Sequence, residues 1–189
     1  MKRFFLVSVL SLFAVGAILV AQVSAQSGSG VDLRQQASCE EKMLQLMGAR
    51  EVNDGPLYQI SSEIAFVFGR STPRLYFTPR VFGIRYIAGS VFTDGRGKIL
   101  FAEGYLGRLA NVEAVRGHVA HEVAHVVKDD GAFGCDDYIP RDIKLEKAVD
   151  ALAAETIGYQ YIRAWLIRLK ELDLSVDDVD VRLEALGSE

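Results

Sequence analysis

The chain of 189 residues lacks several features that would suggest a function on their own. It has two cysteines, Cys39 and Cys135, and no CxxC pair, which argues against a zinc site built from cysteine. Its formal net charge is −4, so nucleic acid is not expected as the main partner. Beyond the N-terminal region no stretch is long and apolar enough to cross a bilayer, and no internal repeat occurs. Any catalytic chemistry must therefore come from other residues.

The N-terminus is typical of an export signal. Lys2 and Arg3 precede an apolar run, residues 4–21, and a small-residue cleavage site ends at Ala25. We predict a protein that is exported and is periplasmic or secreted, with residues 4–21 as a retained membrane anchor in the alternative. The expected segments are a signal peptide (1–25), a flexible linker (26–30) and one domain (31–189).

A metal-binding motif, HEVAH at residues 121–125, lies within an apolar, helix-patterned segment, residues 112–127. Histidines four residues apart share one helix face with their Cβ atoms about 5–6 Å apart, so both imidazoles can reach one metal ion. This HExxH pattern is typical of zinc hydrolases, in which the glutamate is the general base. It predicts His121 and His125 as zinc ligands and Glu122 as the catalytic residue.

Two histidines leave the expected site one ligand short, because a catalytic zinc usually has three protein ligands and a water. In metzincins the motif continues with glycine at position 128 and with histidine or aspartate at position 131. This chain has Lys128 and Gly131 at these positions. The sequence therefore excludes that type of zinc peptidase.

A glutamate on a following helix is the other common third ligand, and Glu146 is placed for that role. Asp150 lies one helical turn later on the same face, where it can accept the outer N–H of a ligating histidine. Glu155 and the loop pair Asp136-Asp137 are rival ligands without such a neighbour. We therefore predict Glu146 as the third ligand and Asp150 as its supporting residue.

The chain has three histidines, and His118 lies one turn before the motif. Seven residues of helix rise about 10 Å, so His118 cannot share one site with both other histidines, and a buried or cleft-lining side chain is expected. No histidine is left downstream to stabilise an oxyanion. The candidates for that role are Tyr159, Tyr161 and Arg163, although such residues are more often part of the core or the surface.

The pattern of hydrophobic residues predicts an α+β fold that is mainly helical. We expect the metal-binding helix to pack on a small antiparallel sheet and to be followed by a long helix that carries the third ligand. Asn111 and Asp142 are the expected N-caps of these two helices. The expected helices are 31–50, 57–68, 104–109, 112–128, 143–172 and a short terminal one, and the expected strands are 74–78, 86–92 and 98–102.

The two cysteines acquire a role if the protein is exported. A disulfide between Cys39 and Cys135 is then expected, with two buried free thiols as the alternative. Cys135 lies in an expected loop, residues 131–140, that follows the metal motif. If this loop covers the metal, activity would depend on the redox state of Cys135.

Three segments of the chain occur together in a known family. The strand 74–77, the HExxH helix and the segment 146–151, Glu-Lys-Ala-Val-Asp-Ala, resemble the gluzincin metallopeptidases that include HtpX and the CAAX prenyl proteases, especially small exported members. The resemblance covers residues 74–157 and implies the same ligands, base and supporting aspartate as above. Val149 replaces the family's usual alanine, and its Asn-Ala-Phe edge strand and its later histidine are absent.

These observations predict a zinc endopeptidase that acts on unfolded or misfolded proteins of the cell envelope or outside the cell. An extended polypeptide substrate would pair with the edge strand 86–92. A membrane is expected as a partner only if the N-terminal segment is retained. The alternative is an exported zinc-binding, chaperone-like module that holds polypeptide without cutting it, and the presence of Glu122 weighs against it.

Overall fold

The computed structural model describes residues 41–42, 44–79, 88–91, 97–109, 111–128, 142–172 and 178–187, with the backbone alone at 88–91. The described residues belong to one unit, Leu33–Glu189. The predicted signal peptide and linker, both cysteines and the pair Asp136-Asp137 lie outside the described residues and stay predictions. Among the described helices, none has the length and apolar character that crossing a membrane requires.

A four-stranded sheet, in the order β1-β2-β4-β3, forms one layer of the described structure. Its strands are β1 (Arg50–Val52), β2 (Arg74–Thr78), β3 (Ala88–Val91) and β4 (Lys98–Ala102). The two outer pairs are antiparallel, but the central pair of β2 and β4 is parallel. The expected antiparallel pairing is therefore confirmed for the two outer pairs and wrong for the central pair. The reason is that β3 takes the edge, and its hairpin partner β4 returns between β3 and β2.

The short strand β1 is not among the expected elements, since the expected helix ends at residue 50 and no strand is expected at residues 51–52. A strand of three residues is too short to show an alternation of apolar and polar side chains in the sequence. It is defined by its pairing with β2, in which Arg50 lies opposite Phe77. The side chains of Arg74 and Glu51 add an ion pair of 2.8 Å across these two strands. Residues 41–42 and 44–46 are helical, as expected.

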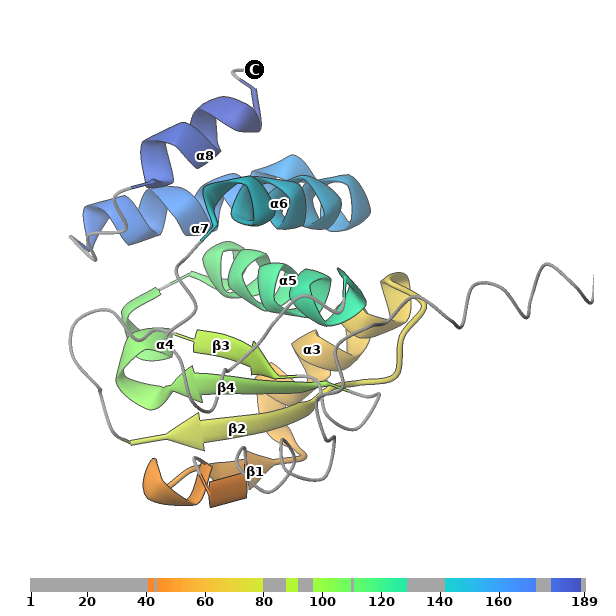
Figure 1. Cartoon of the computed structure of the whole chain (residues 1–189), viewed down its shortest axis with the longest axis vertical. Coiled ribbons are helices and arrows are strands. Elements are labelled where there is room, and N and C mark those ends of the chain that lie inside the picture. The colour runs from red at the N-terminus through yellow and green to blue at the C-terminus, as the bar shows by residue number, and fades with distance from the viewer. Residues whose placement is uncertain are drawn as a thin grey trace, which may run out of the picture. The chain divides into compact units, whose positions relative to one another are not determined.

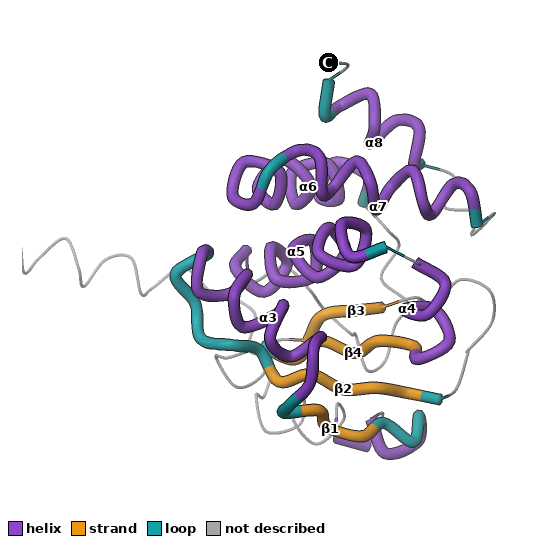
Figure 2. Tube along the Cα trace, turned by 180° about the vertical axis from the view of Figure 1, so that it is seen from behind, coloured by secondary structure: helices purple, strands orange, loops and turns teal. Residues whose placement is uncertain are grey.

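Helices cover the sheet in two further layers (Figure 1). In that view α5 lies directly above β3, and α6 and α7 lie above α5. Seen from behind, α3 runs across the sheet next to α5 (Figure 2), and these two helices are in contact. The mainly helical α+β class is thus confirmed. The helices are α3 (Gly55–Val67), α4 (Glu103–Leu109), α5 (Val112–Lys128), α6 (Ile143–Ile157), α7 (Tyr159–Glu171) and α8 (Val179–Ala185).

The central strand β4 is buried along its whole length. The side chains of residues 99–101 alternate between two clusters, as the pleat of a strand requires. Ile99 and Phe101 enter the main core under α5, whereas Leu100 packs with Tyr76 and Met47 in a small separate cluster. The main core therefore fills the space between the sheet and the helix that carries the metal motif.

The single helix expected over residues 143–172 is two helices, α6 and α7, separated at Gly158. The backbone of Gly158 has φ 110° and ψ 138°, which interrupts the helix and is readily adopted only by glycine. The break lets α7 cross α5 at close range: a Cβ on Gly117 of α5 would collide with the carbonyl of Tyr161 and approach the Cβ of Trp165 to 2.9 Å. Both glycines thus help to place α7 against α5, the helix with the HExxH motif.

Candidate metal centre

The metal motif lies on α5, which begins as expected at the N-cap Asn111. The Asn111 side chain accepts a hydrogen bond of 2.6 Å from the backbone N–H of Ala114. From Gly117 to Val126 every residue of α5 is buried, because α3, α6, α7 and the sheet all contact this helix. Polar groups buried in this way need partners, since an unpaired one is costly. The two motif histidines and Glu122 therefore cannot be solvated surface residues.

The acidic member of the candidate site comes from the start of α6. Asp142 caps this helix as expected, with its carboxylate accepting a 2.9 Å hydrogen bond from the N–H of Lys144. Glu146 in the first turn and Asp150 one turn later share one face, which meets the two histidines of α5. As their spacing predicts, the two acidic residues thus face the same histidine from one side of α6.

Three side chains converge to form a group that could hold a metal ion. His121, His125 and Glu146 each offer one donor atom, and these atoms all lie within 4.8 Å of one another. The two Nε2 atoms of the histidines are 3.1 Å apart. In the carboxylate of Glu146, Oε2 lies 3.4 Å from Nε2 of His121 and Oε1 lies 3.8 Å from Nε2 of His125.

Asp150 orients the ring of His121 by contacting Nδ1, the nitrogen that is not part of the metal group. Its Oδ1 lies 2.9 Å from Nδ1 of His121, so an Nδ1–H donates to the carboxylate and Nε2 keeps its lone pair for a metal. Burial lowers the pKa of His121, although the hydrogen bond with Asp150 opposes this shift. Burial alone would raise the pKa of Asp150, but hydrogen bonds from Arg182 and His121 lower it to about 2. The aspartate is therefore ionised at neutral pH.

Arg182 on α8 completes this network and was not predicted from the sequence. Its guanidinium is fully buried and donates to both carboxylate oxygens of Asp150, at 2.6 and 2.7 Å. Its third nitrogen, Nη1, lies 3.2 Å from Oε2 of Glu146, an ion pair without hydrogen-bond geometry. One buried cation thus neutralises charge on both acidic residues of α6.

The sequence contains a signal that could have revealed this arginine. Val179, Arg182 and Leu186 are spaced by three and four residues, and all three are buried, the first two on α8 and Leu186 at its C-cap. An arginine at a core position of an amphipathic helix is rarely buried without an acidic partner. Asp150 and Glu146 are the acidic residues predicted at the site, and they are the partners that a buried arginine needs.

Glu122 lies beside the metal group without belonging to it. Its side chain is buried, and the residue is 6% exposed. Burial alone would raise the pKa of Glu122, but a hydrogen bond from His118 and the neighbouring histidines lower it well below its usual range. The buried carboxylate is therefore ionised and next to the site where a metal would lie.

The three residues proposed as oxyanion stabilisers do not join this group. Tyr159 is 41% exposed at the start of α7. The guanidinium of Arg116 lies over the ring of Tyr161, with its Cζ atom 5.8 Å from the ring centroid. Arg163 donates a hydrogen bond of 2.5 Å to the carbonyl of Gly187. Each of them is thus engaged or exposed elsewhere, as the more common core or surface role would require.

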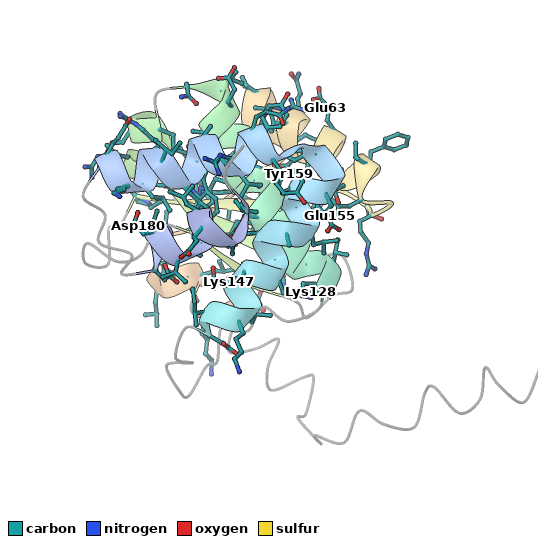
Figure 3. The ribbon with its side chains drawn as sticks, turned by 90° about the horizontal axis from the view of Figure 1, so that it is seen from above. Glu63, Lys128, Lys147, Glu155, Tyr159 and Asp180 are labelled. Carbon is teal, nitrogen blue, oxygen red and sulfur yellow. The ribbon has the colours of Figure 1, made fainter. Side chains whose placement is uncertain are left out.

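The rival ligand Glu155 is also outside the group. It is exposed, and it lies with Tyr159 near the junction of α6 and α7 in the view from above (Figure 3). Among the described residues, the group of His121, His125 and Glu146 is the one that could hold a metal ion.

Comparisons with known proteins add no assignment to this geometry. No family model matches the chain, and no curated protein or solved structure matches it at a significant level. Its function therefore has to be inferred from the residues and their arrangement.

Proposed function

We propose that this protein is a zinc-dependent endopeptidase that hydrolyses peptide bonds in unfolded or misfolded proteins outside the cytoplasm. One observation carries the proposal: a buried glutamate, Glu122, lies beside a ligand group of which it is not a member. A site that only binds metal has no need of such a carboxylate. A hydrolase needs it as a general base.

The ligand set supports zinc as the metal. Two imidazole nitrogens and one carboxylate oxygen are the protein ligands of many catalytic zinc ions. Ligands bound at about 2.0–2.1 Å in a tetrahedron lie about 3.4 Å from one another. The Nε2 atoms of His121 and His125 are 3.1 Å apart, near this value. The carboxylate of Glu146 faces both of them, with Oε2 at 3.4 Å from Nε2 of His121 and Oε1 at 3.8 Å from Nε2 of His125. These three residues would hold the ion.

The chemistry follows from the position of Glu122. Zinc in this site would supply a Lewis acid that acidifies water and polarises a carbonyl group. Glu122 accepts the proton of the attacking water and then donates it to the leaving amine. Because the carboxylate is buried, bulk water competes little for that proton. Asp150 holds His121 in the form that binds metal, and Arg182 holds Asp150.

The edge strand β3 supports a polypeptide substrate. It lies next to α5 and pairs with β4 along one side, as an antiparallel partner. In the described part of the sheet β3 is an outermost strand, so an extended peptide could add to its outer side by backbone hydrogen bonds. Such pairing depends more on the backbone of the peptide than on its side chains, which favours broad action on unfolded chains.

The test compares Glu122→Gln with the unchanged protein. The variant should bind one zinc per chain by elemental analysis and lose casein hydrolysis by about 10²–10⁴-fold, the usual contribution of a general base. Glu155→Gln is the matched control, because it removes an exposed glutamate outside the ligand group. It should change neither zinc content nor activity.

A second candidate is the module that binds polypeptide without cutting it. A hollow of about 650 Å³ supports it, lined mainly by apolar residues that include Leu57, Ile60 and Leu106 and none of the metal group. Zinc binding without any hydrolysis that depends on Glu122 would favour this candidate. A folded protein that binds no zinc would contradict both.

A further inference from the structure

His118 occupies a distinctive place one turn before the metal-binding His121. It is 1% exposed, and it is not one of the three ligands. Its Nε2 lies 3.3 Å from Oε1 of Glu122, four residues along the same helix. The third histidine of the chain therefore contacts the proposed general base.

Three aromatic side chains from three different elements fix the plane of the His118 ring. Trp165 of α7 stacks on it, with centroids 5.0 Å apart and planes within 4°. Phe101 of β4 and Tyr105 of α4 meet it edge to face at 5.3 and 5.2 Å. The indole N–H of Trp165 donates to the hydroxyl of Tyr105 at 3.0 Å, which fixes two of these rings. The imidazole thus has little freedom to tilt.

The two nitrogens of His118 have different surroundings. Nε2 faces the carboxylate of Glu122, which can only accept. Nδ1 is buried and has no hydrogen-bond partner among the described groups. A buried N–H without an acceptor is rare in proteins, and an unpaired acceptor is less so. The hydrogen therefore belongs on Nε2, where it is donated to Oε1 of Glu122.

We infer that His118 is a positioning residue that holds the carboxylate of Glu122 in one orientation by donating a hydrogen bond from Nε2. A carboxylate held through one oxygen presents the other in a defined direction, which a general base at a metal site requires. The inference rests on the proposed peptidase function, because it assigns His118 a role through Glu122. His118 acts without touching the substrate or the metal ligands' donor atoms.

The first test separates hydrogen bonding from packing. His118→Phe keeps an aromatic ring in the box but removes the donor, whereas His118→Gln keeps a donor that can reach Glu122. With zinc bound, His118→Phe should lower kcat for casein by about 10²-fold, the cost of a misplaced catalytic group, and leave KM and zinc content unchanged. His118→Gln should recover about tenfold of that loss. Equal activity of the two variants would show that His118 only fills space and would overturn the inference.

The second test needs neither zinc nor activity. ¹⁵N NMR of the imidazole nitrogens in the metal-free full chain should show an Nε2–H ring that is lost in His118→Phe. His121 should show the opposite form, because its Nδ1 faces Asp150. An Nδ1–H form at His118 would overturn the inference. If Glu122→Gln remains active, the peptidase proposal fails. If Glu122→Gln is inactive but His118→Phe is fully active, the positioning role alone fails.

Discussion

Replacing Arg182 by methionine should destabilise the metal-free protein by about 3–5 kcal/mol, the usual cost of removing one partner from a buried ion pair. Methionine fills a similar volume but carries no charge. The substitution leaves the carboxylates of Asp150 and Glu146 inside the protein without their cation. Since small proteins are stable by about 5–15 kcal/mol, this is a large part of the total.

The magnitude follows from three contacts of one fully buried side chain. The guanidinium makes two hydrogen bonds to Asp150, of 2.6 and 2.7 Å, and an ion pair of 3.2 Å with Glu146. It also lies 5.1 Å from the centroid of the Trp165 ring, a cation–π contact. Charge-assisted hydrogen bonds of this kind are about twice as strong as neutral ones, which places the loss near the upper part of the range.

The assay is urea denaturation in the presence of a chelator, so that no bound metal compensates the carboxylates that have lost their cation. Lys170→Met is the matched control, because Lys170 of α7 likewise forms an ion pair with α8, through Asp180 at 2.6 Å. That pair is exposed, with 61% and 72% of the two side chains accessible. Its loss should cost below about 1 kcal/mol, as is typical of surface ion pairs.

Two further variants separate the effect of charge from that of hydrogen-bond geometry. Arg182→Lys keeps the charge but not the two-pronged geometry, so its stability should lie between those of the unchanged protein and Arg182→Met. Arg182→Met combined with Asp150→Leu should recover part of the loss, since one uncompensated charge is removed. If Arg182→Met costs no more than Lys170→Met, the buried network contributes nothing to folding and the prediction is wrong.

Three other predictions concern the same region. Asp150→Asn should weaken zinc binding by about 10–100-fold in a competition assay with a chelating dye, and an unchanged affinity would show that the bond to His121 has no effect. Gly117→Ala should cost about 1–3 kcal/mol in thermal unfolding, because its Cβ meets the carbonyl of Tyr161, whereas Gly107→Ala, with no atom within 4 Å of its Cβ, should be neutral or stabilising. The lowered pKa of Asp150, about 2 instead of 3.8, stabilises the fold above pH 3.8, and this contribution is lost as the pH falls through about 2. The stability difference between the unchanged protein and Asp150→Asn should therefore shrink by roughly 2 kcal/mol over that interval, and a constant difference would contradict the assignment.

Much of the candidate site could be read from the sequence because it depends on the geometry of single helices. His121 and His125 are four residues apart, so any helix through them puts both on one face. The same rule places Glu146 and Asp150 together on α6. The N-caps Asn111 and Asp142 also act within three residues of their own helices. Such relations are set by the chain locally and need no tertiary information.

The order of the sheet strands and the break at Gly158 could not be read in this way. Both segments of the expected long helix have helical patterns, and a glycine within a helix is tolerated at moderate cost. The break becomes necessary only when α7 must cross α5 at Gly117. Likewise the parallel pairing of β2 with β4 depends on which strand takes the edge, and local patterns do not specify it.

The local sequence places two histidines and a glutamate on one helix and two acidic residues at helical spacing on a later one. The residues that surround these side chains depend on how the helices pack. Arg182 reaches Asp150 across 32 positions of the chain, and the ring of Trp165 reaches His118 from another helix. The physical reason is that hydrogen-bond spacing along a helix is local, whereas the pairing of buried charges depends on which helix faces are packed together.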